Sequence, residues 1–151
     1  MFAVSSAPLS AIKTLFAHGA KSLNTLQTIA ESRQEGRVEV MKYLLDQGAE
    51  INARKWEDHP ETWENFEMLG LGTALHYAAR NGDSKTVSFL LDRGARVEIG
   101  DSIGETPLGN ARWCCENNLK DGDDTKKQEH QQCIALLVGA ESKLRTINAR
   151  M

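Results

Sequence analysis

A repeated segment is the feature of this sequence that most restricts its fold. Gly36–Ala49 and Gly82–Ala95 each begin with a glycine and reach the pair Gly-Ala twelve residues later. Between these glycines, apolar residues stand at positions i, i+3 and i+4, which is the spacing of a helix with one buried face. The second glycine of each segment is typical of a helix C-terminus, where a left-handed conformation is needed. The chain is therefore predicted to repeat one helical unit.

Two shorter copies extend the repeat toward both ends of the chain. Ala11–Ala20 and Cys133–Ala140 carry similar apolar runs, and each also ends in Gly-Ala. Four equivalent helices are thus expected. A unit of this size cannot bury its apolar face alone, so neighbouring units must stack against one another.

A second motif precedes the helix of the third unit. Thr73-Ala74-Leu75-His76-Tyr77-Ala78 lies before it, and Thr106-Pro107-Leu108 restates the motif 33 residues later, counted from Thr73 to Thr106. Leu26–Ala30 is a degenerate copy that lacks the His. Together these segments resemble the Thr-Pro-Leu-His-x-Ala signature and the period of ankyrin repeats. The resemblance implies an all-α solenoid of antiparallel helix pairs with hairpin-like loops.

The resemblance also implies roles for the motif residues. Thr73 is expected to cap the inner helix, and His76 to hydrogen-bond toward the Thr turn and the adjacent repeat. Small residues allow close approach of inner helices, while leucines fill the space between repeats. The structural set is Thr73, Leu75, His76, Ala78, Ala79, Gly82, Gly94, Thr106, Pro107 and Leu108.

Departures from the regular spacing locate two insertions. Gly48 to Thr73 is 25 residues against 12 from Gly94 to Thr106, so the segment Ile51 to Leu71 is thirteen residues too long. A comparable excess lies near Glu116 to His130. We expect a single domain over 1–151, with repeats at about 5–20 (partial), 21–50, 69–100 and 101–140, insertions at about 51–68 and 116–130, and a tail at 141–151.

The two insertions differ in composition. The first, Ile51 to Leu71, combines three aromatic residues (Trp56, Trp63 and Phe66) with five acids (Glu57, Asp58, Glu61, Glu64 and Glu67). One interpretation is a binding surface with aromatic anchors and a preference for a basic partner. The other is that the rings fold back over the neighbouring hairpin. The second insertion has charged residues and no aromatic ring, and is expected to be a solvated, mobile loop.

The resemblance implies binding of another protein and no enzyme activity. Partner contacts are expected on the concave side, formed by hairpin tips and inner helices. This nominates Ser102, Ile103 and Glu105 from a hairpin and Tyr77, Arg80 and Asn81 from a helix, together with Trp56, Glu57, Asp58, Trp63 and Phe66. An ordinary solvated helix face remains the alternative for Tyr77, Arg80 and Asn81. A second possibility is that these repeats position a catalytic or signalling domain in a larger protein.

Composition excludes several other classes of function. The formal net charge of −3 lacks the basic excess typical of nucleic-acid binding. No apolar run is long enough to span a membrane. Three Cys residues, an odd number, do not suit a disulfide framework and favour a reducing compartment, the cytoplasm or the nucleus.

Four residues near the C-terminus have side chains that can bind zinc. Cys114, Cys115, His130 and Cys133 are possible ligands. Adjacent Cys side chains on a helix diverge by about 100°, which does not suit a structural zinc site. The sequence therefore predicts no metal and no cofactor, with Cys114 and Cys133 as buried apolar residues.

Overall fold

The computed structural model describes residues 9–17, 25–32, 35–117 and 123–151. Its elements, in chain order, are α1 (Leu9–Ala17), α2 (Thr25–Glu31), α3 (Arg37–Asp46), α4 (Pro60–Phe66), the 3-10 helix η1 (Glu67–Leu69), α5 (Ala74–Arg80), α6 (Ser84–Asp92), α7 (Pro107–Asn117) and α8 (Asp124–Ala149). The part of the chain described here contains helices and no strand. The predicted all-α fold class is confirmed.

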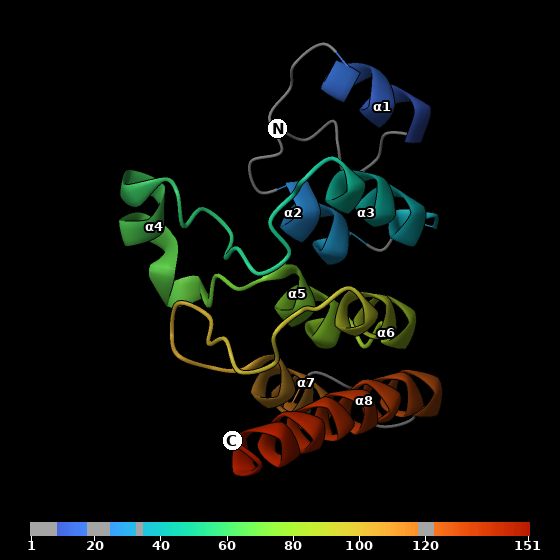
Figure 1. Cartoon of the computed structure of the whole chain (residues 1–151), viewed down its shortest axis with the longest axis vertical. Coiled ribbons are helices and arrows are strands. Elements are labelled where there is room, and N and C mark those ends of the chain that lie inside the picture. Colours follow the sequence, from blue (N-terminus) through green and yellow to red (C-terminus); the bar gives the residue numbers. More distant parts are fainter. Residues whose placement is uncertain (1–8, 18–24, 33–34, 118–122) are drawn as a thin grey trace.

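The helices form pairs that stack along one axis (Figure 1). The pairs are α2 with α3, α5 with α6, and α7 with α8. Stacking joins α2 to α5 and α5 to α7 in an inner row, while α6 contacts α8 in an outer row. α1 packs on α3, at the end of the stack where the partial first repeat was expected.

Small residues allow the inner helices to lie close together. Ala74, Ala78 and Ala79 of α5 are completely buried, as is Ala111 of α7. Larger side chains fill the space between the layers: Leu26, Met41, Leu44, Leu75, Leu90 and Leu137 are almost inaccessible. The close approach of small residues is what makes one continuous core out of units that are each too thin to have their own.

Gly48 and Gly94, the two glycines expected at helix ends, share one hydrogen-bond pattern with Gly82. Gly94 has φ of 88°, its N–H donates to the Leu91 carbonyl, and the Ala95 N–H donates to the Leu90 carbonyl. This pair of bonds is the Schellman motif, which requires a left-handed residue. Gly48, with φ of 88°, and Gly82, with φ of 68°, are followed by the same pattern.

Asp83 joins two neighbouring repeats at the start of α6. Its carboxylate accepts the Thr86 N–H at 3.2 Å, capping the helix. The same carboxylate lies 2.6 Å from Nε of Arg37, at the start of α3. The helix cap and the ion pair together hold α3 and α6 in register.

The first insertion is more ordered than the loop expected from the sequence. It contains α4 and η1, which project from the hairpin side of the stack (Figure 1). Helix formation follows from Pro60 at the first helical position and Glu61 in the first turn, both favourable at a helix N-terminus. No residue of α4 is fully buried. The insertion is therefore a short helical arm beside the repeats.

The second insertion and the tail also differ from expectation. A solvated loop was expected over 116–130 and a separate tail over 141–151, but α7 runs to Asn117 and α8 is one helix of 26 residues, Asp124–Ala149. Asp123 caps α8 by accepting the Lys126 N–H at 3.3 Å. Residues 118–122 of the expected loop lie outside the described residues. The excess length is thus mostly helix, because it extends the outer helix at both ends.

Candidate functional site

His76 connects its own helix to the hairpin of the next repeat. Its Nδ1 accepts the Thr73 backbone N–H at 3.0 Å, so Nε2 carries the proton and donates to the Glu105 carbonyl, also at 3.0 Å. The ring is completely buried. Burial is the main cause that lowers the pKa of His76 to about 4, so the ring is neutral at physiological pH. His76 makes both contacts that the family resemblance implies, and it is a structural residue.

Asp101 organises the tip of the hairpin between α6 and α7. Its side chain is fully buried, and Oδ1 accepts the N–H groups of Ile103 at 3.1 Å and Glu105 at 3.0 Å. Oδ2 accepts from Nη2 of Arg80 at 2.8 Å and Nδ2 of Asn110 at 3.1 Å. A buried carboxylate needs such a complete set of donors. Asp101 was not identified from the sequence, although an acid five residues before the Thr-Pro pair was a visible signal.

Four residues nominated for partner binding make contacts within the chain. Arg80 donates to Asp101 and to the Gly70 carbonyl, the latter at 2.6 Å. Asn81 donates to the Ala30 and Glu31 carbonyls of α2, each at 3.1 Å.

Tyr77 and Ser102 are occupied in the same way. Tyr77 is buried, and burial raises the pKa of its hydroxyl to about 12. Ser102 Oγ accepts the Leu71 N–H at 2.6 Å. Arg80, Asn81, Tyr77 and Ser102 therefore take part in contacts between elements, and their role in partner binding stays a prediction.

The two tryptophans of the arm are half-buried and lie against cations of their own segment. The Arg54 guanidinium is 4.9 Å from the centre of the Trp63 ring, and Lys55 Nζ is 5.1 Å from that of Trp56. Trp56 also packs on Phe66, with ring centres 5.7 Å apart. Lys55 continues to the Tyr77 ring, 5.3 Å away, which ties the arm to α5.

One acid of the arm is neutralised locally. Glu57 accepts from Nη2 of Arg54 at 2.6 Å, and this hydrogen bond holds the pKa of Glu57 below its usual range. The Asp58 carboxylate lies 3.9 Å from Nε2 of His59. The remaining nominated residues, Ile103 and Glu105, have exposed side chains at the hairpin tip.

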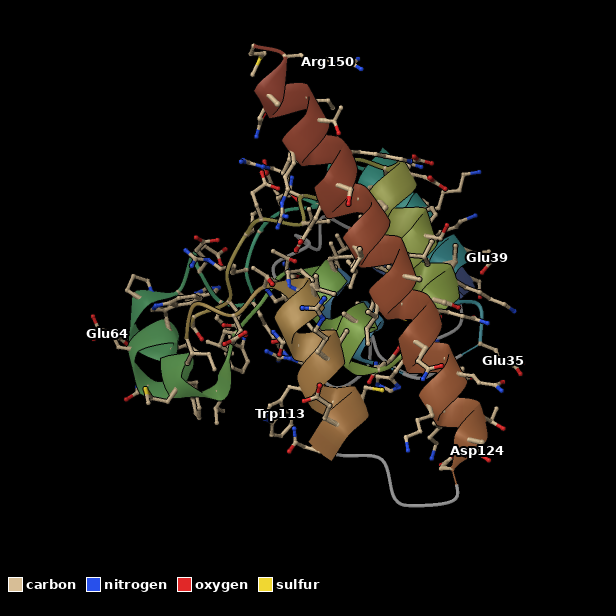
Figure 2. The ribbon with its side chains drawn as sticks, turned by 90° about the horizontal axis from the view of Figure 1, so that it is seen from below. Glu35, Glu39, Glu64, Trp113, Asp124 and Arg150 are labelled. Atoms are coloured by element: carbon tan, nitrogen blue, oxygen red, sulfur yellow. The ribbon has the colours of Figure 1, made fainter. Side chains whose placement is uncertain are left out.

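Three exposed apolar residues were missed by the sequence analysis. Met68 and Leu69 in η1 are 81% and 68% exposed, and Trp113 in α7 is 58% exposed. Figure 2 shows Trp113 on the flank of α7 that faces away from α8, on the same side of the molecule as α4. The signal for Trp113 was its position off the buried stripe of Leu108, Ala111 and Cys114.

The cysteines and His130 form contacts in the core. Cys114 and Cys133 are buried, and burial raises the pKa of the Cys133 thiol to about 12. Both ring nitrogens of His130 lie 3.0 Å from carbonyl oxygens, those of Lys126 and Arg80. Within the described ranges, no three His, Cys, Asp or Glu side chains gather in a way that could hold a metal ion. Likewise, no helix that the structure describes has the length and apolar character needed to cross a membrane.

Comparison with known proteins matches the middle of the chain. The family described as ankyrin repeats (many copies) matches residues 26–91. A putative ankyrin repeat protein of Rickettsia bellii is 38% identical over 81 residues, which cover 46% of this chain and 34% of that protein. The ankyrin repeat and KH domain-containing protein mask of Drosophila melanogaster is 36% identical over 83 residues, covering 55% of this chain and 2% of that protein.

A third relative has a name that does not mention the repeats. The mitochondrial disaggregase of Bos taurus is 35% identical over 96 residues, covering 62% of this chain and 14% of that protein. The matched part is thus about a third or less of each of these relatives. The family match over residues 26–91 and the stacked helix pairs agree with the repeat motif in the sequence: this stretch of the chain is similar to ankyrin repeats.

Proposed function

We propose that this chain is a non-catalytic module that binds another protein on its hairpin side, with the arm of α4 and η1 forming part of the binding surface. Ankyrin repeats are generally protein-protein interaction modules. We choose this side of the stack because most of the exposed large apolar residues lie there. Phe66, Met68, Leu69, Ile103 and Trp113 are all on the arm, the hairpin tip or the inner helix α7.

The test is affinity capture with the whole chain as bait, followed by quantitative mass spectrometry. A matched bait replaces 51–69 with the short connection found between Gly94 and Gly104. We expect a partner that is retained by the whole chain and depleted with the shortened one. Partners that bind both baits equally would show that the arm does not contribute, and binding that is lost only when the outer face of α8 is altered would place the site elsewhere.

A second candidate is that the repeats position a catalytic domain outside these 151 residues. It is favoured by the lengths of the relatives, one of which is serine/threonine-protein kinase 12 of Arabidopsis thaliana, 38% identical over 77 residues that make up 14% of that protein. An antibody against α8 separates the two candidates in a cell extract. A band at the mass of 151 residues supports the independent module, and a much larger band supports the second candidate.

We also propose an intracellular location, in the cytoplasm or the nucleus. The support is that Cys114, Cys115 and Cys133 form no disulfide, and cysteines outside disulfides are most stable in a reducing compartment. Microscopy of the tagged chain tests this, and recovery of the chain from the extracellular medium would contradict it.

A further inference from the structure

Exposed apolar side chains gather on one part of the hairpin side. Besides Met68, Leu69 and Trp113, Phe66 is 44% exposed and Ile103 is 53% exposed. Eight large apolar residues are exposed in the part of the chain that the structure describes, and five of them belong to this group. Single exposed apolar residues are ordinary on a protein surface, whereas a group of them marks an interaction site.

Specific contacts bring these residues together from three elements. Leu71 and Ser102 exchange two hydrogen bonds, of 2.6 Å and 3.0 Å, which places the end of η1 beside the hairpin tip. The Ile103 side chain lies against Gly70, next to Leu69.

The hairpin tip is joined to α7 through Asn110. Its amide donates to Asp101, and its Oδ1 accepts from Arg80 at 2.7 Å. Trp113 follows Asn110 by about one helical turn, so it is on the same flank of α7. In both views the hairpin lies between the arm and α7 (Figures 1 and 2).

Charge around this group is predominantly negative. The basic residues Arg54 and Lys55 lie in ion pairs of 2.6 Å with Glu57 and Glu31 respectively, and Arg112, next to Trp113, adds one exposed positive charge. The exposed acids are Asp58, Glu61 and Glu64 on the arm and Glu105 on the hairpin. No ion pair joins Glu61, Glu64 or Glu105 to another described residue. The Glu105 carboxylate lies beside Gly109, about one turn before Trp113, so a negative charge directly borders the apolar group.

We propose that Phe66, Met68, Leu69, Ile103 and Trp113, bordered by these acids, form a docking surface for a partner segment that carries apolar side chains flanked by Lys or Arg. This inference rests on the proposed protein-binding function and specifies the chemistry of the partner. Apolar anchors supply affinity when they are desolvated, and complementary charge at the rim speeds association and selects the partner.

The same charges argue against a second copy of this chain as the occupant. In a symmetric dimer this surface would face itself, so the four exposed acids of each copy would be brought close to those of the other. Like charges in such an interface oppose association. Trp56 and Trp63 are not part of the docking surface because their rings already pack against Lys55 and Arg54.

The test uses random peptides displayed on phage and selected on the full immobilised chain. Enriched peptides are synthesised, and their affinity is measured by fluorescence anisotropy for the original chain and for variants. Met68→Ser, Ile103→Ser and Trp113→Ser each remove one exposed anchor. Ile147→Ser is the matched control, since Ile147 is also 58% exposed but lies on α8.

Enriched peptides are expected to combine apolar residues with a net positive charge. Each anchor variant should weaken binding by about tenfold or more, while Ile147→Ser should leave it unchanged. Glu105→Gln should reduce the association rate, most clearly at low salt. Unchanged thermal unfolding of the variants would assign these losses to the surface.

Several results would overturn the inference. The selection could enrich acidic peptides or enrich no peptide. The control variant could weaken peptide binding as much as the anchor variants do. The chain could also associate with itself in a way that Met68→Ser abolishes. A folded partner captured in the experiment on the proposed function, but insensitive to the anchor variants, would leave that function standing while removing this surface.

Discussion

At the residue scale, His76 shows how one side chain can hold two repeats together. Both ring nitrogens are used: Nδ1 must be unprotonated to accept the Thr73 N–H, whereas the proton on Nε2 donates to the Glu105 carbonyl. The buried site opposes the charged form, which places the pKa at about 4, against 6.5 for an ordinary His. Stability should therefore depend on pH through this residue.

We predict that the contribution of His76 is complete above about pH 6.5 and is lost as the pH falls toward 4. In that range the unfolded chain binds a proton that the folded chain does not, so the free energy of unfolding decreases, by up to about 3 kcal/mol. Urea unfolding at several pH values measures this. The variant His76→Gln is the reference, because Asp and Glu residues titrate in both proteins and only the difference between the two pH profiles belongs to His76. Identical pH dependence of the two would contradict the buried neutral state.

Asp101 gives a second prediction at the same scale. Asp101→Ala removes the acceptor for Arg80, Asn110 and two backbone N–H groups, and leaves a partly buried guanidinium without its partner. The expected loss is about 3 kcal/mol or more in the free energy of unfolding. Asp92→Ala, at an exposed position in α6, is the control and should cost little. A loss below about 1 kcal/mol for Asp101→Ala would mean that the network is not what fixes the hairpin tip.

At the scale of elements, the Gly-Ala pair lies at the end of some helices and inside another. It ends α3 and α6, where the glycine is left-handed and the chain turns into a hairpin. In α8 the same pair, Gly139-Ala140, lies inside the helix. The residues that follow each pair explain the difference. After Ala140 the chain continues with helix-forming residues, and Leu144 packs against the core. After Gly94, by contrast, the β-branched residue Val97 follows closely.

This difference leads to a matched pair of substitutions. Gly94→Val should cost on the order of 1 kcal/mol or more, because a β-branched residue resists φ of 88° although no atom lies within 4 Å of the new Cβ. The side chain added by Gly139→Val also enters open space. It lies inside a helix, where the helix propensity of Val is slightly higher than that of Gly. The melting temperature should therefore fall for Gly94→Val and rise slightly for Gly139→Val. A destabilised Gly139→Val would contradict the continuous α8.

The arm provides the second prediction about an element. Trp63 packs on Arg54 within the arm, and α4 buries no residue completely. Trp63→Ala is expected to loosen α4 locally and to change the global free energy of unfolding by less than about 1 kcal/mol. Hydrogen exchange should accelerate over 60–66 and stay unchanged in α5 and α6. A large global loss would instead mean that the ring supports the repeat core.

The sequence predicted the repeat core well and the variable parts poorly, for a physical reason. Burial in a stack imposes a fixed period, so Leu75, Leu90 and the glycine turns were recognisable from spacing alone. The exposed surface has no such constraint. Tyr77, Arg80 and Asn81 looked like a free helix face, but the next repeat and the hairpin supply partners that no local pattern indicates. Met68 and Leu69 were overlooked because only their exposure distinguishes them from core residues.

At the scale of the whole molecule, the two sides of the stack differ in their chemistry. The outer row, α3, α6 and α8, is mainly polar where it is exposed, and Glu35, Glu39 and Asp124 lie on that side (Figure 2). The hairpin side carries the exposed apolar group, the acidic arm and the tip organised by Asp101. We therefore propose that a partner is bound on the hairpin side.

The most direct test is to map a bound peptide on the isotope-labelled chain by NMR, using a peptide from the selection or the partner's own segment. We predict the largest chemical-shift changes at 66–69, 101–105 and 109–113, with none on the exposed face of α8. We also predict that Trp113 loses solvent exposure. Changes centred on α3, α6 or α8, with residues 66–69 and Trp113 unaffected, would contradict binding on the hairpin side.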